Sequence, residues 1–234
     1  MNNILSILIF APIILSVPIL FFRDKDKLIK IYSLVVSSAV FGLAVYLFMI
    51  FNPANPDFQF IEKHQWVRDF NIYYLLGVDG ISLLMVMLTA FIFPVTILGV
   101  WNSVATRVKE FYFLLLLLMG SLFGVFLSLD LILFYVFWEL ILIPMYFIIG
   151  FWGGKNKYYA NLKFFLYTMF GSLLMLVAII WVAQYCTPQL AKFTTDYTEL
   201  RKVSPFIPES IALWLFIFFG ISFAIKVPVF PFHT

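Results

Sequence analysis

Residues 134–154 read FYVFWELILIPMYFIIGFWGG, and with the residues before them they form an apolar stretch long enough to cross a bilayer as a helix. Glu139 is the one acidic or basic residue in this stretch. It lies near the middle of a predicted span over 131–151, at about 1.5 Å per helical residue. A charge there costs about 2.5–3.5 kcal/mol even on the lenient insertion scale. The stretch therefore predicts a membrane protein and marks one carboxylate that needs an explanation.

The composition of the whole chain agrees with a membrane protein. Of the 234 residues, 64% are hydrophobic and 12% are charged, and the mean hydropathy is +1.03. A soluble domain is usually about 45–50% apolar. The net charge of +3 does not indicate nucleic acid, because the basic residues fall in short loops. The single cysteine, Cys186, excludes an internal disulfide.

Seven apolar segments are long enough to span a membrane, which predicts an all-α, polytopic helical bundle. Alternating ten-residue strands are absent, so we do not expect a β-barrel. The first segment lacks a basic leader and contains two prolines, so we expect it to be retained rather than cleaved. Two longer loops remain, over 52–78 and 186–209, and the first is expected to lie along the membrane interface. The segments are 4–22, 28–51, 79–102, 111–129, 131–151, 162–185 and 210 onward.

The loops differ in charge from one side of the predicted bundle to the other. Nine basic residues fall on one side in short loops, and five fall on the other side in longer loops. The positive-inside rule places the first side in the cytoplasm or matrix and the N-terminus outside. The nine are Arg23, Lys25, Lys27, Lys30, Arg107, Lys109, Lys155, Lys157 and Lys163. The five are Lys63, Arg68, Lys192, Arg201 and Lys202.

After this assignment, one carboxylate and one amine remain inside the membrane, Glu139 and Lys226. Glu139 is either a protonated side chain that makes one interhelical hydrogen bond or a site that loads and releases protons. The phenols of Tyr135 and Tyr146 are expected on its helix face. Pro144 is expected to free a backbone carbonyl one turn before it.

Lys226 lies near the end of the seventh segment, which we expect to begin at about Ile211. Pro228 and Pro231 follow it and are expected to break the helix. Broken helices are common at transporter ion sites. The alternative is a helix-end lysine that extends to the inner interface. His233 is either a proton relay or an ordinary loop histidine.

Other features of the sequence are expected to be structural. Asp79, in LGVDGIS over 76–82, is expected to cap the third helix. Four small residues are expected at close helix contacts. These are Gly120, Gly124, Gly171 and Ser172. The sequence shows no phosphate-binding loop, and His64 and His233 are too far apart to argue a shared metal site.

Several motifs resemble the antiporter-like membrane subunits of proton-pumping NADH:quinone oxidoreductase, respiratory complex I. They are the stretch over 134–154, KFFLYTMFGSLLML over 163–176, AIKVPVFPFHT over 224–234, and LGVDGIS. The resemblance covers essentially the whole chain. WELILIP followed by GFWGG is similar to the M (chain 4) branch of this family rather than to the L and N branches or the multisubunit cation/proton antiporters.

The resemblance implies specific roles. Glu139 matches the family's fifth-helix glutamate, which pairs with the lysine of a broken seventh helix, here Lys226. His233 and Asp130 match two further positions of the proton path, less closely. No redox cofactor is implied for this subunit, because NADH, FMN, iron–sulfur clusters and quinone are handled by other subunits. The implied partners are other membrane-arm subunits, the lipid bilayer and protons, with no nucleic acid. A bacterial inner membrane is expected, and a mitochondrial one is the alternative.

The resemblance also implies how the chain divides. Residues 1–110 would hold helices 1–3 with the outer loop 52–78, and residues 111–234 an incomplete first antiporter-like repeat with helices 4–7. The family has roughly fourteen helices in two inverted repeats, so the chain corresponds to its N-terminal half. We expect either part of a longer protein or a product that does not pump. The alternatives in function are a cation/proton antiporter subunit and a structural membrane protein in which Glu139 and Lys226 form an assembly salt bridge.

Overall fold

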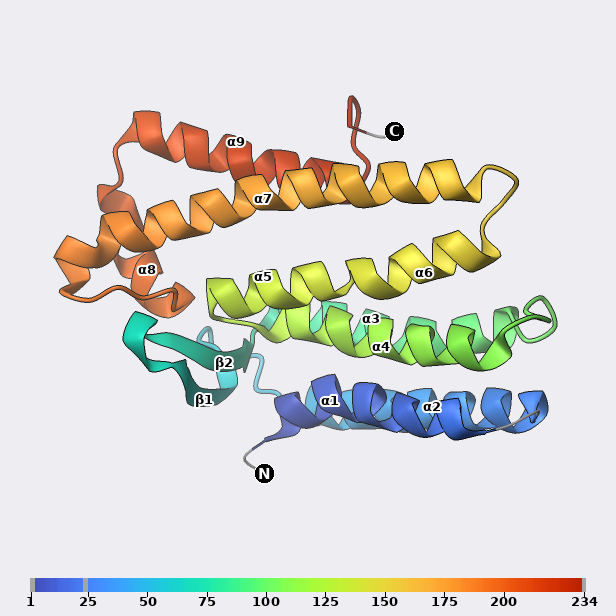
Figure 1. The fold of residues 1–234 in the computed structure, drawn as a ribbon. Helices are drawn as coiled ribbons and strands as arrows, with labels where there is room; N and C mark the ends of the chain where they lie inside the picture. The colour runs from blue at the N-terminus through green and yellow to red at the C-terminus, as the bar shows by residue number, and fades with distance from the viewer. Residues whose placement is uncertain (1–2, 23–24, 233–234) are drawn as a thin grey trace.

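The computed structural model describes residues 3–22 and 25–232. Seven helical segments in these residues are long and apolar enough to cross a membrane, as predicted, and they run roughly side by side (Figure 1). They are α1 (Ile4–Ser16) with the 3-10 turn η1 (Val17–Phe21), α2 (Asp26–Ile50), α3 (Gly80–Gly99), α4 (Val108–Leu127), α5 (Leu131–Leu140) with α6 (Leu142–Trp152), α7 (Lys157–Leu190) and α9 (Glu209–Lys226).

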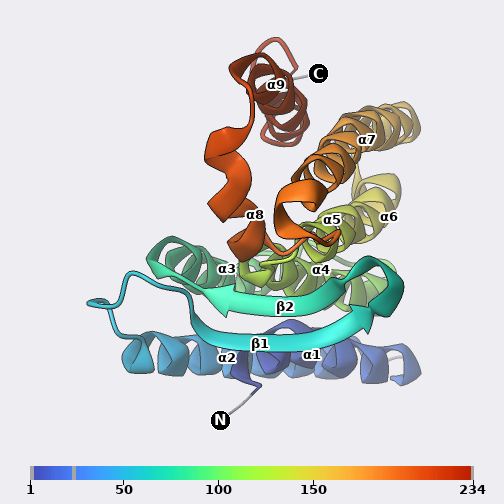
Figure 2. The same ribbon diagram turned by 90° about the vertical axis from the view of Figure 1, so that its left-hand side faces the viewer.

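The segment predicted as an interfacial loop contains a β-hairpin. Strands β1 (Gln59–Val67) and β2 (Ile72–Val78) pair antiparallel, and Asn71 takes a left-handed conformation between them, with φ of 47°. Figure 2 shows the hairpin lying across one end of the helix bundle. We predicted an interfacial loop from the aromatic and charged composition of this segment. An irregular loop and a β-hairpin can have the same composition, so composition did not indicate the strands.

The loop predicted over 186–209 is also more ordered than expected. Helix α7 continues to Leu190, and a short helix α8 (Tyr197–Val203) follows, with the 3-10 turn η3 (Ser204–Phe206) after it. At 34 residues, α7 is longer than a hydrocarbon core of about 30 Å requires. We therefore infer that α7 extends beyond the hydrocarbon core.

The core of the bundle is centred on α4. Its buried side chains include Tyr112, Leu116, Met119 and Phe123, and it packs against α1, α2, α3, α5 and α6. The predicted close contacts are present. A methyl group at Gly120 would meet Ile9 and Ile13 of α1, one at Gly124 would meet the Phe137 ring of α5, and one at Gly171 would meet Ile225 of α9.

The fifth predicted span is divided at Ile141, where α5 ends and α6 begins. Pro144 explains the division, because it has no N–H to donate and its ring clashes with the carbonyl four residues earlier. The backbone amides of Ile141 and Met145 still bond to Phe137 and Ile141 at 3.3 Å, so the two halves follow one another with a kink. The kink comes two residues after Glu139.

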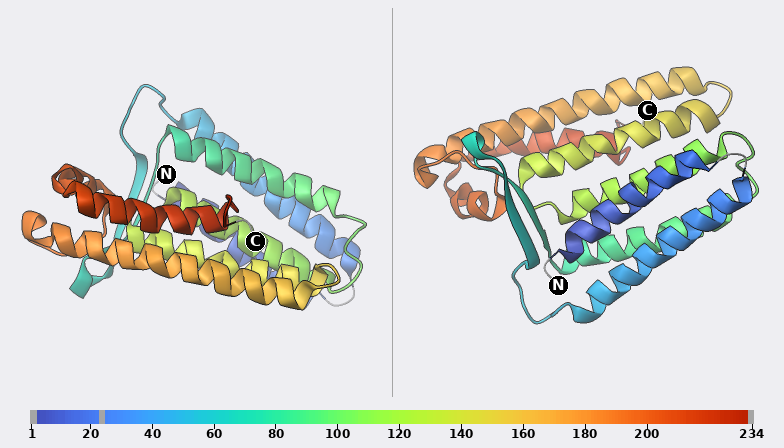
Figure 3. Two further views of the ribbon diagram at one scale, coloured as in Figure 1. Left: turned by 90° about the horizontal axis from the view of Figure 1, so that it is seen from above. Right: turned by 60° about the horizontal axis from the view of Figure 1, so that its bottom comes forward.

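Helix α9 packs along α7 (Figure 3). Its buried residues are Ser222 and Ile225, both near its end. It ends at Lys226, just before Pro228 and Pro231, as predicted. Figure 1 shows that α9 ends part of the way along α7, and this brings Lys226 to the level of α5 in the membrane interior.

Candidate functional site

Lys226 is held against helix α5 by the residue that precedes Glu139. Its ammonium Nζ donates a hydrogen bond of 2.6 Å to the carbonyl of Trp138. The same Nζ lies 3.8 Å from the centroid of the Trp138 ring, a cation–π contact. The Trp138 ring also meets Phe223, one turn before Lys226, edge to face at 5.4 Å between centroids. These contacts join the end of α9 to the middle of the α5–α6 span.

Glu139 follows Trp138 directly, but its carboxylate is incompletely paired. Its Oε1 is buried and has no hydrogen-bond partner among the described residues. Nor do those residues include an ion pair between Glu139 and Lys226 within 4.0 Å. The carboxylate nevertheless acts electrostatically on both Lys226 and Tyr135. Lys226 and Glu139 therefore lie in one region of the bundle, while their direct pairing stays a prediction.

The phenols predicted near Glu139 lie in different surroundings. Tyr135 lies within the electrostatic range of Glu139 and interacts with Ser172 of α7. Tyr146 is beyond the kink at Ile141, and its ring meets Phe165 of α7 at 5.4 Å. Tyr135 is therefore a neighbour of the carboxylate, and the place of Tyr146 beside Glu139 stays a prediction.

A groove leads to Trp138 from the end of the bundle that carries the hairpin, which the loop charges predict to be the outer end. It has a volume of about 460 Å³, and its wall is mainly apolar. Asp79 and Ser82 line it at the start of α3, where they form the predicted cap through bonds of 2.8 and 2.9 Å. Trp138 and Phe223 line it deeper in the membrane. The groove therefore borders the aromatic group that holds Lys226.

Asp130, a predicted proton-path residue, is fully buried and engaged through both oxygens. As the N-cap of α5, it accepts bonds from the amides of Ile132 and Leu133. It also accepts from the amide of Tyr73 at 3.1 Å and from the Thr195 hydroxyl at 2.8 Å. Burial raises the pKa of Asp130, and these hydrogen bonds oppose that rise. The contacts describe a helix cap that joins the hairpin to the loop before α8, and its role in proton transfer stays a prediction.

Asp196 continues this network at the outer face. It is buried and forms an ion pair of 2.8 Å with Lys63 of β1. Its other oxygen accepts from the amide and hydroxyl of Thr198 at the start of α8. Burial acts to raise the pKa of Asp196, but the Lys63 ammonium and the Thr198 bonds hold it below its usual value. Asp196 thus ties the hairpin to α8.

Glu62 of β1 is a buried carboxylate in the segment that was predicted to be an interfacial loop. It accepts from the amides of Leu5 and Ser6 and from the Ser6 hydroxyl, so it caps α1 from the hairpin. Tyr74 joins the cluster through a bond of 2.7 Å to Ser6. Burial raises the pKa of Tyr74 to about 12, the Ser6 bond lowers it and the Glu62 charge raises it further. One signal in the sequence could have indicated this cluster. Pairing the two halves of residues 59–78 as a hairpin places Glu62 and Tyr74 on neighbouring strands.

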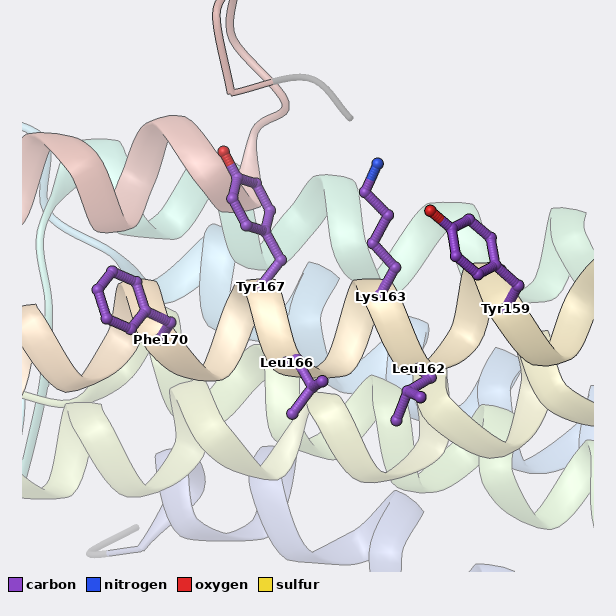
Figure 4. A pocket seen from close by; sticks show the side chains of 6 residues that line it. All are labelled: Tyr159, Leu162, Lys163, Leu166, Tyr167 and Phe170. Carbon is purple, nitrogen blue, oxygen red and sulfur yellow. The ribbon is translucent and has the colours of Figure 1, made fainter.

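Lys163 lies deeper in a helix than the sequence suggested. Helix α7 begins at Lys157, so Lys163 is in its second turn, not at its first residue. Figure 4 shows Lys163 pointing to the same side of α7 as Tyr159 and Tyr167, along a groove of about 420 Å³. This groove does not include Glu139 or Lys226. His233, the remaining predicted site residue, lies outside the described residues.

No group of three or more histidine, cysteine, aspartate or glutamate side chains that could hold a metal ion occurs in residues 3–22 and 25–232. The ionisable groups that the interior site brings together are the Glu139 carboxylate and the Lys226 amine. A lysine held by neutral groups next to a buried carboxylate is suited to proton transfer within a membrane.

Comparison with known proteins gives a matching family model, a curated relative and two solved structures. Residues 128–234 match the family model described as NADH:quinone oxidoreductase/Mrp antiporter, TM. The chain is 42% identical over 250 aligned positions to NADH-quinone oxidoreductase subunit M of Rhodobacter capsulatus, covering 100% of this chain and 47% of that protein. It therefore spans about half the length of the curated relatives it matches.

Two solved structures share the fold. Respiratory complex I from Thermus thermophilus with bound NADH contains a chain that matches with a TM-score of 0.82 at 28% identity, over 98% of this chain and 45% of that one. The Mrp complex from Dietzia sp. contains a chain that matches with a TM-score of 0.79 at 17% identity, over 97% of this chain and 24% of that one. The second likeness shows the fold alone.

Proposed function

Because the chain belongs to the antiporter-like membrane subunits of the NADH:quinone oxidoreductase family, we propose that it is a proton-translocating, membrane-arm subunit of such a complex. It is a multi-pass membrane protein, and the bacterial source of its relative favours a bacterial inner membrane. NADH oxidation and quinone reduction would take place in other subunits, without a redox cofactor here. The other membrane-arm subunits would be its partners.

The observation that carries this proposal is the contact of Lys226 with Trp138. The carbonyl and ring of Trp138 together form the binding site of the ammonium, which we call its seat. The Lys226 ammonium binds the carbonyl of Trp138, one residue before a carboxylate whose Oε1 is buried and unpartnered. Lys226 would carry the proton, and Glu139 would control how readily it does so. A Glu139 carboxylate favours the ammonium through charge attraction, and neutralising or moving that carboxylate favours proton release from Nζ to a water molecule. Asp130 and His233 would belong to the same path.

The proposal predicts that Glu139→Gln lowers proton pumping and the NADH oxidation coupled to it, while the complex still assembles. We expect a loss of about tenfold, which corresponds to one pK unit of charge interaction. The variant would be made in the native gene, and pumping would be measured in membrane vesicles with subunit levels quantified in parallel. Glu199→Gln is the matched control, because it removes an ion-paired carboxylate at the outer face.

Each alternative has its own result. Normal pumping in Glu139→Gln would refute the proposed role of the site. Loss of the subunit from the complex, with normal pumping by what remains, would indicate an assembly role. Transport that needs sodium and is independent of NADH and quinone would indicate a cation/proton antiporter subunit.

A further inference from the structure

Trp138 contacts Lys226 in two independent ways. Its carbonyl accepts the ammonium proton at 2.6 Å, and its ring lies 3.8 Å from the same nitrogen. Tryptophan is the aromatic side chain that binds cations most strongly through its face, and exclusion of water strengthens the contact. The ammonium therefore has a seat built from one neutral residue.

The ring that forms this seat is held in place from two sides. Phe134, one turn earlier on α5, lies 5.5 Å from it at an interplanar angle of 31°. Phe223 of α9 meets it edge to face at 5.4 Å. The backbone of α5 is itself fixed against α4, where the Phe137 ring fills the space beside Gly124. The position of the seat is thus determined by α4 and α5, not by the lysine.

The seat lies beside a second potential partner for the ammonium. Glu139 is the next residue, and its Oε1 is buried without a hydrogen-bond partner in the described part of the chain. Lysine has a flexible four-carbon stem, so a small change in its rotamer or in the end of α9 moves Nζ between neighbouring residues. A charged lysine has two adjacent seats here, one neutral and one anionic.

We propose that Trp138 is a positioning residue that holds the Lys226 ammonium away from the Glu139 carboxylate, so that the lysine alternates between the two during proton transfer. This inference rests on the proposed function, since it assigns a role within that site. The tryptophan ring would keep the lysine charged and in place while it is not paired with the carboxylate. The strength of the ring contact would then set how long the lysine remains beside Trp138 before it pairs with Glu139.

The test compares substitutions of Trp138 in the native gene and complex. Trp138→Phe keeps an aromatic face and is expected to retain pumping within about twofold of the unmodified protein. Trp138→Leu removes that face and is expected to lower the number of protons pumped per NADH oxidised by about fivefold. Trp181→Leu is the matched control, because Trp181 stacks on Tyr185 at 4.9 Å and takes part in none of the cation–π contacts of the described residues. It should leave the ratio unchanged.

A second measurement separates the cation contact from packing. Fluorinated tryptophans keep the shape of the ring but weaken its attraction for cations. Pumping should fall stepwise with the number of fluorine atoms in the unmodified protein, and should not change with fluorination in the Trp138→Phe variant. This comparison remains informative if Trp138→Leu fails to accumulate in the membrane.

The outcomes distinguish the inference from the function on which it rests. A stepwise loss with fluorination that disappears in Trp138→Phe supports the role of Trp138. Pumping that is insensitive to fluorination, or equally sensitive in Trp138→Phe, overturns it. If Glu139→Gln lowers pumping while fluorination does not, the proposed function stands and this inference fails. If neither changes pumping, both fail.

Discussion

Asp130 and Glu139 lie nine residues apart on one helical segment, and the two carboxylates are held in opposite ways. Asp130 accepts hydrogen bonds through both oxygens from backbone and hydroxyl donors. Glu139 has a buried oxygen without a partner among the described residues. A carboxylate whose acceptors are all occupied stabilises the fold, because any change in its charge disrupts several bonds at once. A carboxylate with a free acceptor can change partner, and Glu139 has a lysine beside it.

The largest expected effect is on stability at the outer face. Asp130→Ala removes the cap of α5 and leaves the buried donors of Tyr73 and Thr195 without their acceptor. We expect a loss of about 3 kcal/mol in the free energy of unfolding. The measurement is the thermal stability and membrane level of the subunit, with Asp130→Asn as the control that retains one acceptor. Normal stability with lost pumping in Asp130→Asn would show that Asp130 serves the proposed proton path and that its cap adds little to stability.

The next prediction compares how rigidly α5, which carries Glu139, and α9, which carries Lys226, pack against neighbouring helices. Gly124→Ala is expected to cost about 2 kcal/mol, because its new methyl group meets several atoms of the buried Phe137 ring. Gly171→Ala should be nearly neutral, because its methyl group meets mainly the end of the Ile225 side chain, Cδ1, at 2.7 Å. Unfolding in detergent would measure both. Equal costs would contradict the view that α5 is the fixed element and α9 the adaptable one.

The ion pair at the outer face predicts a response to acid. The folded-state pKa of Asp196 is lowered, so its contribution to stability is present above the ordinary carboxyl value of 3.8 and is lost as the pH falls below it. We expect faster hydrogen exchange in the hairpin at pH values below about 4. In Lys63→Met the hairpin should exchange faster at neutral pH, at a cost of about 1 kcal/mol. An unchanged acid response in that variant would show that other carboxylates cause it.

The smallest expected effect concerns Tyr74. Tyr74→Phe removes the bond to Ser6, which keeps Glu62 as a partner, and should cost about 0.5 kcal/mol. The Tyr74 pKa of about 12 is raised from 10.0, so its contribution to stability is complete below pH 10 and is lost as the pH rises toward 12. Ultraviolet titration of the phenols should show one fewer late-ionising tyrosine in Tyr74→Phe than in the unmodified protein. Unchanged late ionisation in the variant would refute this assignment.

Much of the fold was predictable because membrane helices are encoded locally. A run of about 20 apolar residues is sufficient to predict a span, and the seven predicted spans agree with the seven in the described residues. The Asp79 cap and the end of α9 before Pro228 were predictable for the same reason, since a cap and a proline act on their own helix. The hairpin was missed, because its strands are stable only through pairing with one another and contact with the helix ends.

The sequence by itself determined that Glu139 and Lys226 are the charges left in the membrane, because a charge count and a hydropathy pattern need no coordinates. Only the tertiary structure decided their surroundings. The Lys226–Trp138 bond joins residues 88 positions apart, and the Thr195–Asp130 and Lys63–Asp196 contacts join residues 65 and 133 positions apart. Local periodicity carries no information on contacts between residues so far apart in the sequence. They arise when packed helices bring particular side chains together, and that packing left Asp130 bonded through both oxygens and Glu139 with an oxygen that has no partner among residues 3–22 and 25–232.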